Sequence, residues 1–257
     1  MKRLKNLVPK PLRRWLNLRV QGAQRSLIVF DRVTDWSVLR SVRPHRRHFG
    51  LDRGEPIDRF YIEKFLANYQ ELICGNVAEI GDSNYTRRFG GGRVERSDVI
   101  DINEKNDQRT MTIDLTQTMA APADLFDCII CTQTVFEIRD SAAAIRSLFK
   151  MLRPGGSLLA TVPGITQSVR GEMLGGAGGD WWRFTARSAR RAFGEVFPEE
   201  GLAIHTYGNV LAATALLHGL VQDELTGDEL EYHDPDYEVI IGIKATKPTQ
   251  ALSTLAL

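Results

Sequence analysis

The chain has 257 residues, of which 43% are hydrophobic and 25% charged, as is usual for a folded water-soluble domain. No apolar run is long enough to cross a bilayer, and three cysteines give no disulfide framework. These numbers argue against an integral membrane protein and a disulfide-rich secreted scaffold, and they fit one α/β domain with an added arm. The N-terminus lacks an apolar stretch with a cleavage site, so we expect a cytoplasmic protein without a signal peptide.

Residues 1–48 are predicted to form a basic N-terminal arm, because they hold thirteen Lys and Arg against two Asp. The remainder holds 20 basic and 30 acidic residues. Trp15, Leu16, Leu18 and Val20 alternate with arginines, a pattern that allows a short amphipathic helix. This helix either binds an anionic membrane surface at the inner face or packs on the body with its basic side in solvent. Nucleic acid is a weaker option, since aromatic platforms are sparse here.

Helical and extended patterns alternate through the body, which we expect over 49–247, followed by a flexible tail over 248–257. Predicted helices cover 56–72, 141–152, 185–196 and 209–223. Predicted strands cover 77–81, 97–102, 110–113, 126–131, 156–162, 202–207 and 238–245. This alternation predicts a doubly wound α/β fold with a mostly parallel sheet covered on both faces.

The end of the first predicted strand carries the clearest functional signal. An apolar strand that stops at Gly81 leaves backbone N–H groups free at a turn, and Asp101 ends the next strand twenty positions later. A carboxylate there can accept hydrogen bonds from both hydroxyls of a ribose. Ser83 and Tyr85 stand where a dinucleotide fingerprint requires small residues. The site therefore suits a nucleoside without a pyrophosphate, which favours S-adenosylmethionine over NAD.

Two further segments should reach the same edge of the sheet, because loops after parallel strands open at the carboxyl edge. Asp114 can accept a hydrogen bond from an adenine amino group, and the Leu115 N–H can reach a ring nitrogen. Thr132 and Gln133 follow the fourth strand. Taken singly, Asp101 is an ordinary solvated strand end and Asp114 an ordinary helix cap. The ordered set is what indicates a cofactor site.

In this order, five segments resemble class I S-adenosylmethionine-dependent methyltransferases: VAEIG at 77–81, SDVID at 97–101, DL at 114–115, FDCII at 126–130 and LRPGG at 152–156. The resemblance covers roughly residues 56–246. YTRRFG at 85–90 and WRFT at 182–185 are similar to a bacterial subgroup often found beside glycosyltransferases.

The resemblance implies a Rossmann-like sheet of seven strands with the last one antiparallel. It also implies S-adenosylmethionine contacts at Glu79, Gly81, Asp82, Ser83, Asp101, Asp114, Leu115, Thr132 and Gln133. The family's first loop has two more small residues where this chain has Ser83 and Tyr85, so Tyr85 must swing out or stack on the ligand. A non-catalytic partner protein that keeps the fold is therefore the alternative to an enzyme.

Methyl transfer to a hydroxyl requires a base, and Glu137 and Asp180 are the candidates near the expected acceptor position. Trp181, Trp182 and Arg183, with Tyr85, are candidate substrate contacts, because aromatic faces stack on sugar rings and Arg pairs with anions. Alternatively, one Trp belongs to the core and Arg183 bridges an acid. The glycine-rich stretch 171–180 is a mobile lid or a disordered insertion. We expect the acceptor to be a sugar, a glycan or a glycolipid intermediate, or another small molecule.

No metal site is expected. Cys128 and Cys131 form a CxxC inside a predicted strand, where residues three apart point to opposite faces, so they are expected to be buried thiols. His45 and His48 lack the further ligands that a metal needs. His205 lies within a predicted strand and is expected to be structural.

Overall fold

The computed structural model describes residues 41–169 and 179–249. Most of the predicted arm, all but two residues of the predicted lid and most of the predicted tail thus lie outside the described residues. The chain divides into two units, Met1–Pro44 and His45–Leu257. In the first unit, the Ser41 hydroxyl donates to the Arg43 carbonyl at 2.6 Å. The second unit contains the sheet and every element considered below.

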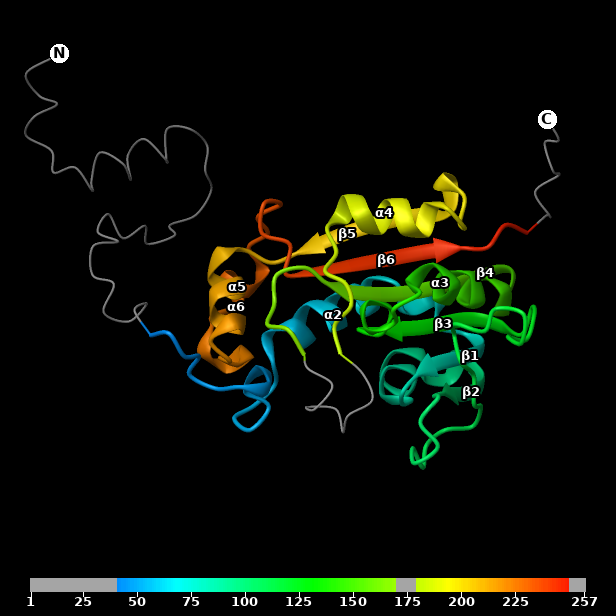
Figure 1. Ribbon diagram of the computed structural model, residues 1–257, viewed down its shortest axis with the longest axis horizontal. Coiled ribbons are helices and arrows are strands. Elements are labelled where there is room, and N and C mark those ends of the chain that lie inside the picture. Colours follow the sequence, from blue (N-terminus) through cyan, green and yellow to red (C-terminus); the bar gives the residue numbers. More distant parts are fainter. Residues whose placement is uncertain (1–40, 170–178, 250–257) are drawn as a thin grey trace, which may run out of the picture. The chain divides into compact units, whose positions relative to one another are not determined.

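Six strands form one mixed sheet with the order β2-β1-β3-β4-β6-β5 (Figure 1). They are β1 Gly75–Ile80, β2 Val94–Ile100, β3 Phe126–Thr132, β4 Leu152–Pro163, β5 Leu202–Tyr207 and β6 Ile240–Thr246. Strands β1 to β4 are parallel, whereas β6 runs antiparallel to both β4 and β5. The expectation of a mostly parallel sheet with an antiparallel last strand is confirmed.

The expected seventh strand over 110–113 is wrong for the described residues, because this segment makes a single parallel bridge between Ile100 and Met111. The Thr110 hydroxyl accepts a hydrogen bond from the Val99 N–H at 3.0 Å and donates to Asp98 at 2.9 Å. The Thr110 side chain thus takes up the Val99 N–H, a donor that the backbone of a paired strand would need. The pairing ends after one bridge for this reason.

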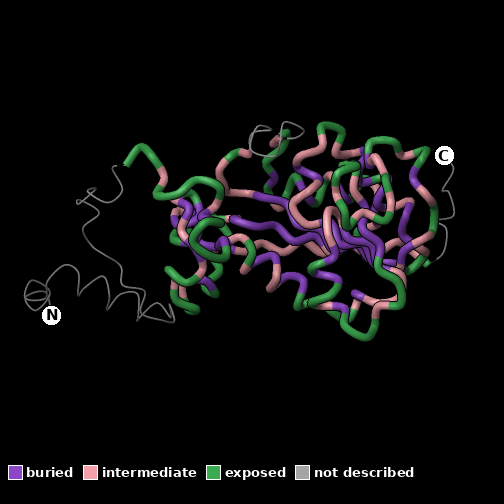
Figure 2. The backbone as a smooth tube through the Cα atoms, turned by 90° about the horizontal axis from the view of Figure 1, so that it is seen from below, coloured by how far each residue is buried: buried purple, intermediate pink, exposed green. Residues whose placement is uncertain are grey.

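Helices cover both faces of the sheet. They are α2 Ile57–Asn68, α3 Ser141–Met151, α4 Ala186–Gly194, α5 Val210–Leu217 and α6 Gly227–Glu231. One apolar cluster joins α3 and α4 to the sheet, and a second joins α2 and α5 to the opposite face. Figure 2 shows the buried strands between these layers. The predicted helix 209–223 ends early because Gly219 adopts a φ of +70°.

The central strand β3 contributes to both clusters. Cys128 belongs to the cluster of α2 and α5, and Cys131 to that of α3 and α4. Both thiols are fully buried and free, and burial raises the pKa of Cys131 to about 12. These cysteines are buried on opposite faces, as their spacing predicts.

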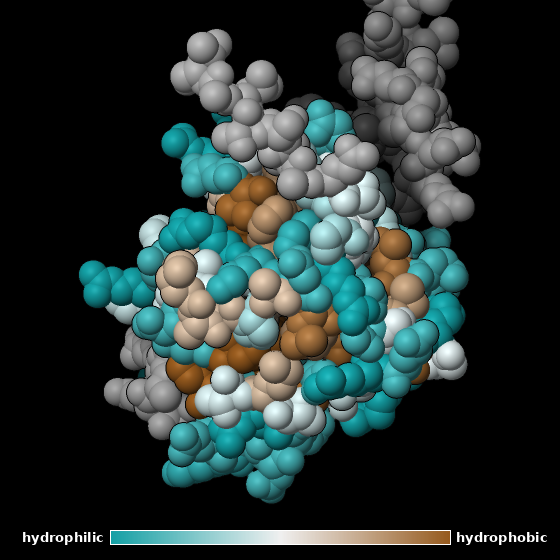
Figure 3. Space-filling view, turned by 90° about the vertical axis from the view of Figure 1, so that its right-hand side faces the viewer, coloured by the Kyte–Doolittle hydropathy of each residue, from teal (hydrophilic) through white to brown (hydrophobic). Residues whose placement is uncertain are grey.

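The carboxyl and amino ends of the parallel strands lie at opposite ends of the sheet. Because β6 points to the right in Figure 1, the carboxyl ends of β1 to β4 lie at the opposite end. Figure 3 faces the amino ends of these strands, where hydrophilic side chains surround smaller apolar patches. No helix within the described ranges is long and apolar enough to cross a membrane.

Candidate active site

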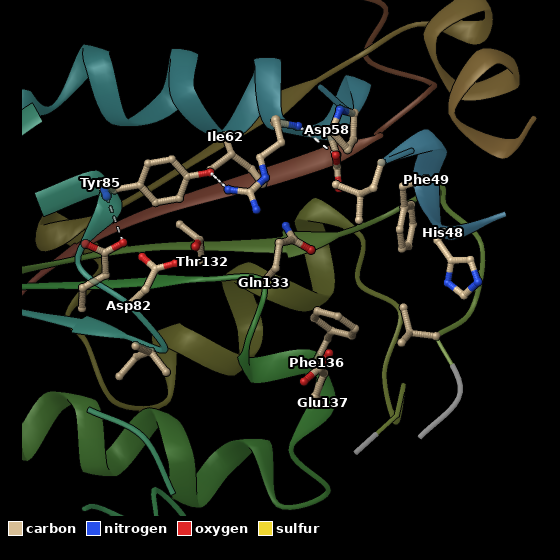
Figure 4. Close-up of a pocket in the computed structure, with 16 residues that line it drawn as sticks. His48, Phe49, Asp58, Ile62, Asp82, Tyr85, Thr132, Gln133, Phe136 and Glu137 are labelled. Carbon is tan, nitrogen blue, oxygen red and sulfur yellow. Dashed lines mark hydrogen bonds between the residues drawn. The ribbon is translucent and has the colours of Figure 1, made fainter. Parts of the chain in front are cut away.

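A cavity of about 420 Å³ opens at the carboxyl edge of the parallel strands. Its walls come from five places: the turn η2 (His48–Gly50), the start of α2, the end of β1 with the loop after it, the end of β3 with the short helix η6 (Val135–Glu137), and Val169 after β4 (Figure 4). Six residues singled out in the sequence line it, namely Glu79, Asp82, Tyr85, Thr132, Gln133 and Glu137. The edge therefore brings together residues that are far apart along the chain.

Gly81 lies at this edge next to the cavity-lining Asp82. Its φ is +91°, and a Cβ added to it would meet nothing within 4 Å. Its N–H donates to the Ile100 carbonyl at 3.0 Å, which joins the ends of β1 and β2. The backbone at Gly81 is thus open to the close approach of a ligand.

Asp101 follows β2, and its carboxylate is held by its own loop. Oδ1 accepts from the Asn103 N–H at 2.8 Å, and Oδ2 accepts from Asn106 Nδ2 at 2.7 Å. The same Asn106 amide nitrogen also donates to the Gly81 carbonyl at 2.6 Å. Asn106 thereby connects two predicted cofactor residues. Sequence reasoning missed it, because an asparagine in a loop carries no motif.

Asp114 and Leu115 do not line the cavity. Asp114 Oδ1 accepts from the Thr116 N–H at 2.8 Å and from its hydroxyl at 2.7 Å, as a capping residue does. Leu115 is 6% exposed, and its carbonyl accepts from the Ser147 hydroxyl at 2.7 Å. In this structure their polar groups form hydrogen bonds within the protein, Asp114 with Thr116 and Leu115 with Ser147 of α3.

Glu79 lines the cavity but is only 2% exposed. Its carboxylate accepts from the N–H groups of Tyr85 at 3.1 Å and Thr86 at 2.7 Å, and from the Thr86 hydroxyl at 2.8 Å. Burial raises its pKa to about 7, and a hydrogen bond with Asp82 contributes to the rise. Glu79 therefore fixes the start of the π-helical turn η4 (Thr86–Gly90).

Two other residues of this loop, Asp82 and Ser83, form hydrogen bonds with nearby residues of the chain. Ser83 is buried, and its hydroxyl accepts from Arg87 Nη1 at 2.6 Å. Asp82 accepts from the backbone N–H and the side-chain amide of Asn84, both at 2.8 Å. Of the two, Asp82 lines the cavity.

Tyr85 is turned back toward α2 and is 6% exposed. Its hydroxyl accepts a hydrogen bond from Arg59 Nη1 at 2.8 Å, and the Arg59 guanidinium carbon lies 5.8 Å from the ring centroid. Burial raises the pKa of Tyr85. This bulky residue thus brings a cation from α2 to the cavity wall, an arrangement that the local sequence did not reveal.

The backbone bends sharply at three points around the cavity. His48, Phe49 and Gln133 have φ values of +55°, +59° and +47°. Among the described residues, one other non-glycine residue, Asp124, has a positive φ in this range. Gln133 is held by its N–H to the Thr161 carbonyl at 2.9 Å and by Nε2 to the Thr161 hydroxyl at 3.2 Å. Conformations of this kind concentrate at ligand sites.

The two predicted bases have different surroundings. Glu137 lines the cavity, and burial, followed by the charge of Asp180, raises its pKa. Asp180 lines neither cavity described here. Its Oδ2 accepts from the Val169 N–H at 2.8 Å and pairs with Arg183. Of the two predicted bases, Glu137 is therefore the one that a ligand in the cavity can reach.

The predicted substrate contacts at 181–183 lie next to Phe136, and of these three residues Arg183 lines a cavity whereas the two tryptophans do not. The N–H groups of Trp181 and Trp182 donate to the Phe136 carbonyl at 3.0 and 3.1 Å, and both indoles are exposed. Arg183 Nη2 donates to the Gln167 carbonyl at 2.7 Å. Arg183 also lines a second cavity of about 30 Å³, which shares Phe49 and Phe136 with the first.

His205 lies away from the cavity on β5, where its Nε2 is 2.6 Å from the Tyr69 hydroxyl. Burial lowers its pKa. Within the described ranges, no three His, Cys, Asp or Glu side chains cluster as a metal site would require.

Solved structures that are similar to this chain include three methyltransferases. The N-methyltransferase NodS from Bradyrhizobium japonicum WM9, in complex with S-adenosyl-L-homocysteine, is 18% identical; the match covers 76% of this chain and 90% of NodS, with a TM-score of 0.45. An S-adenosylmethionine-dependent methyltransferase from Mesorhizobium loti is 14% identical, with 77% and 100% covered and a TM-score of 0.47. One from Archaeoglobus fulgidus is 12% identical, with 74% and 94% covered and a TM-score of 0.46.

No curated protein matches the sequence. The family model described as "Methyltransferase domain" matches residues 67–203, which is more than half of the chain and includes β1 to β4 with the carboxyl edge. The chain therefore belongs to the methyltransferase-domain family.

Proposed function

We propose that this protein is an S-adenosylmethionine-dependent methyltransferase that methylates a hydroxyl of a sugar, glycan or glycolipid intermediate. The supporting observation is the cavity of about 420 Å³ at the carboxyl edge, which joins the residues after β1 to Glu137 after β3. The glycosyltransferase-associated subgroup that the sequence resembles supports the choice of acceptor. The S-adenosyl-L-homocysteine bound to NodS supports the choice of cofactor.

The residues present fit this cofactor. Gly81 offers an open backbone, and Asp101 is a carboxylate positioned by two asparagines. Near the cavity, Asp82 would hold the ammonium group of the methionine part. Arg59, the one Lys or Arg among the cavity-lining residues, would hold its carboxylate.

When bound, S-adenosylmethionine supplies a methyl group on a positively charged sulfur, which leaves as a neutral thioether. The chain's own task is to orient the acceptor oxygen and to remove its proton. Glu137 is the group for this step, because its raised pKa brings its basicity closer to neutral pH. Gln133, fixed on Thr161, would position the acceptor beside it.

Aromatic side chains favour a sugar ring at the acceptor end. Phe49 and Phe136 line both cavities, and the backbone of the exposed Trp181 and Trp182 donates to the Phe136 carbonyl. Apolar faces of sugar rings pack on aromatic rings, and the polar edge is left for hydrogen bonds.

Calorimetric titration with S-adenosyl-L-homocysteine tests the cofactor, and labelled-methyl transfer into fractionated cell glycans and lipids tests the acceptor. We expect saturable binding and label in a glycan or glycolipid fraction. No heat and no thermal shift at millimolar ligand would refute the cofactor. Binding without transfer to any fraction would favour the non-catalytic partner instead. A parallel titration with NAD separates a nicotinamide-dependent enzyme.

The basic arm over 1–48 supports an additional role at an anionic membrane surface. Salt-sensitive co-sedimentation with anionic vesicles is expected for the full chain. Equal co-sedimentation of a chain lacking residues 1–48 would refute this role.

A further inference from the structure

Asp58 lies in the first turn of α2, ahead of the residues that match the family model. It lines the main cavity and the second, smaller one. Figure 4 shows Asp58 and Phe49 toward one end of the cavity, and Asp82 and Tyr85 toward the other. Asp58 is thus at the end away from Asp82, while its neighbour Arg59 reaches across to Tyr85.

The carboxylate of Asp58 has unused acceptor capacity. Oδ1 accepts from the Arg59 N–H at 2.9 Å, and the N–H of Asp58 itself also donates to the carboxylate. No side chain among the described residues donates a hydrogen bond to it. A carboxylate offers about four acceptor sites. Burial raises its pKa, and the two backbone donors and the charge of Arg59 only partly oppose this rise. A ligand that supplies a donor here would satisfy the missing contacts.

The carboxylates at this end of the cavity favour a neutral ligand over an anion. Asp58 and Glu137 lie on opposite sides of Gln133 in the view of Figure 4. Neither carboxylate forms an ion pair with the described residues. The two arginines that line these cavities have partners of their own: Arg59 donates to the Tyr85 hydroxyl, and Arg183 pairs with Asp180. A phosphate or carboxylate placed between the carboxylates of Asp58 and Glu137 is therefore repelled, whereas a hydroxyl can donate to either one.

We propose that Asp58 anchors the acceptor, and that the acceptor end of this cavity takes an uncharged sugar rather than a sugar phosphate. This proposal rests on the proposed methyltransferase function. One hydroxyl of the sugar donates to Asp58, a neighbouring hydroxyl faces Glu137, and the apolar face of the ring packs against Phe49 or Phe136. Asp58 is a binding residue, and it takes no proton from the methylated oxygen.

Saturation-transfer NMR on the full chain, saturated with S-adenosyl-L-homocysteine, tests the proposal with named probes. The probes are methyl hexopyranosides of the common hexoses, the matching hexose 6-phosphates, and ethanolamine. We expect at least one methyl hexopyranoside to bind, and its phosphate to bind at least tenfold more weakly. Asp58→Asn should weaken the sugar at least tenfold. Asp223→Asn, which removes an exposed charge on the short helix Gln222–Glu224, should leave it unchanged.

The outcomes separate two failures. If S-adenosyl-L-homocysteine does not bind the wild-type chain, the proposed function itself is wrong. If it binds with the same affinity to wild type and Asp58→Asn, both are folded at the site and the sugar result decides. Equal sugar binding by both, tighter binding of the phosphates, binding of ethanolamine alone, or no binding of any probe would each overturn the assignment of Asp58.

Discussion

Arg59 Nη1 donates a hydrogen bond of 2.8 Å to the hydroxyl of Tyr85, which joins the first turn of α2 to the loop after β1. Tyr85 stands where the resembled family has a small residue, and its side chain points back to α2. The exchange of a small residue for tyrosine thus places a guanidinium at the cavity.

Replacement of Arg59 should weaken the binding of ligands that carry the cofactor's amino-acid part and leave other ligands unaffected. We expect Arg59→Met to lower the affinity for S-adenosyl-L-homocysteine about 10- to 100-fold, because a charge-assisted hydrogen bond is lost. The affinity for 5′-methylthioadenosine, which has no carboxylate, should be unchanged. Calorimetry with both ligands measures this difference. Arg191→Met, at a side chain that is 85% exposed, is the control. An equal loss for both ligands would contradict the assigned role.

Asp101 is expected to bind the ribose. Asp101→Ala should reduce the affinity for S-adenosyl-L-homocysteine at least tenfold, because a hydrogen-bonded carboxylate is removed from the site. Asn106→Ala should cause a smaller loss, since Asp101 would keep its bond from Asn103. Asp107→Ala, an exposed residue of the same loop, is the matched control for calorimetry. Unchanged affinity in Asp101→Ala would remove this residue from the site.

Glu137 is expected to act in catalysis and not in cofactor binding. Glu137→Gln should lower kcat about 10²- to 10⁴-fold, the usual contribution of a general base. The pH profile of kcat should lose its rising limb, which reports deprotonation of this carboxyl group. The affinity for S-adenosyl-L-homocysteine should stay the same. Glu195→Gln, on an exposed side chain after α4, controls for the loss of a charge. A rate that survives in Glu137→Gln would direct the search to another base.

Glu79 should make stability depend on pH in a defined direction. Its pKa rises from 4.5 to about 7 on folding, so the folded state holds this proton more tightly than the unfolded state. The resulting stability is fully present below about pH 4.5 and is lost as the pH rises through 7. Between pH 5 and pH 8 the loss amounts to about 2–3 kcal/mol.

Urea unfolding of wild type and Glu79→Gln at several pH values measures this effect. The variant has no carboxyl group at this position, so its stability should fall less over the same range. Glu95→Gln, an exposed residue of β2, should follow wild type. Parallel pH curves for wild type and Glu79→Gln would show that Glu79 titrates normally.

The sheet was largely predictable from the sequence, because buried parallel strands are continuous apolar runs between turn residues. The segment 110–113 alternates threonine with apolar residues, and the Thr110 side chain accepts from the Val99 N–H, a donor that further pairing would need. Glu79, Asp82 and Gln133 lie within or directly after the sequence motifs, and the structure places them at the cavity. Asp58 and Arg59 were not predicted, since they precede the motifs and reach the cavity only through the packing of α2 on the sheet. The one available signal was Tyr85, a bulky residue that required a partner.

Backbone conformation, rather than side-chain chemistry, sets much of the wall of this cavity, since His48, Phe49 and Gln133 each bend the chain with a positive φ. A substitution at these positions keeps the path of the chain where the new residue tolerates a positive φ. Laboratory evolution toward new acceptors would do best to begin at positions 48, 49 and 133, where asparagine and glycine also tolerate the bend. Diversity introduced there would alter what the protein accepts and spare the framework that binds its methyl donor.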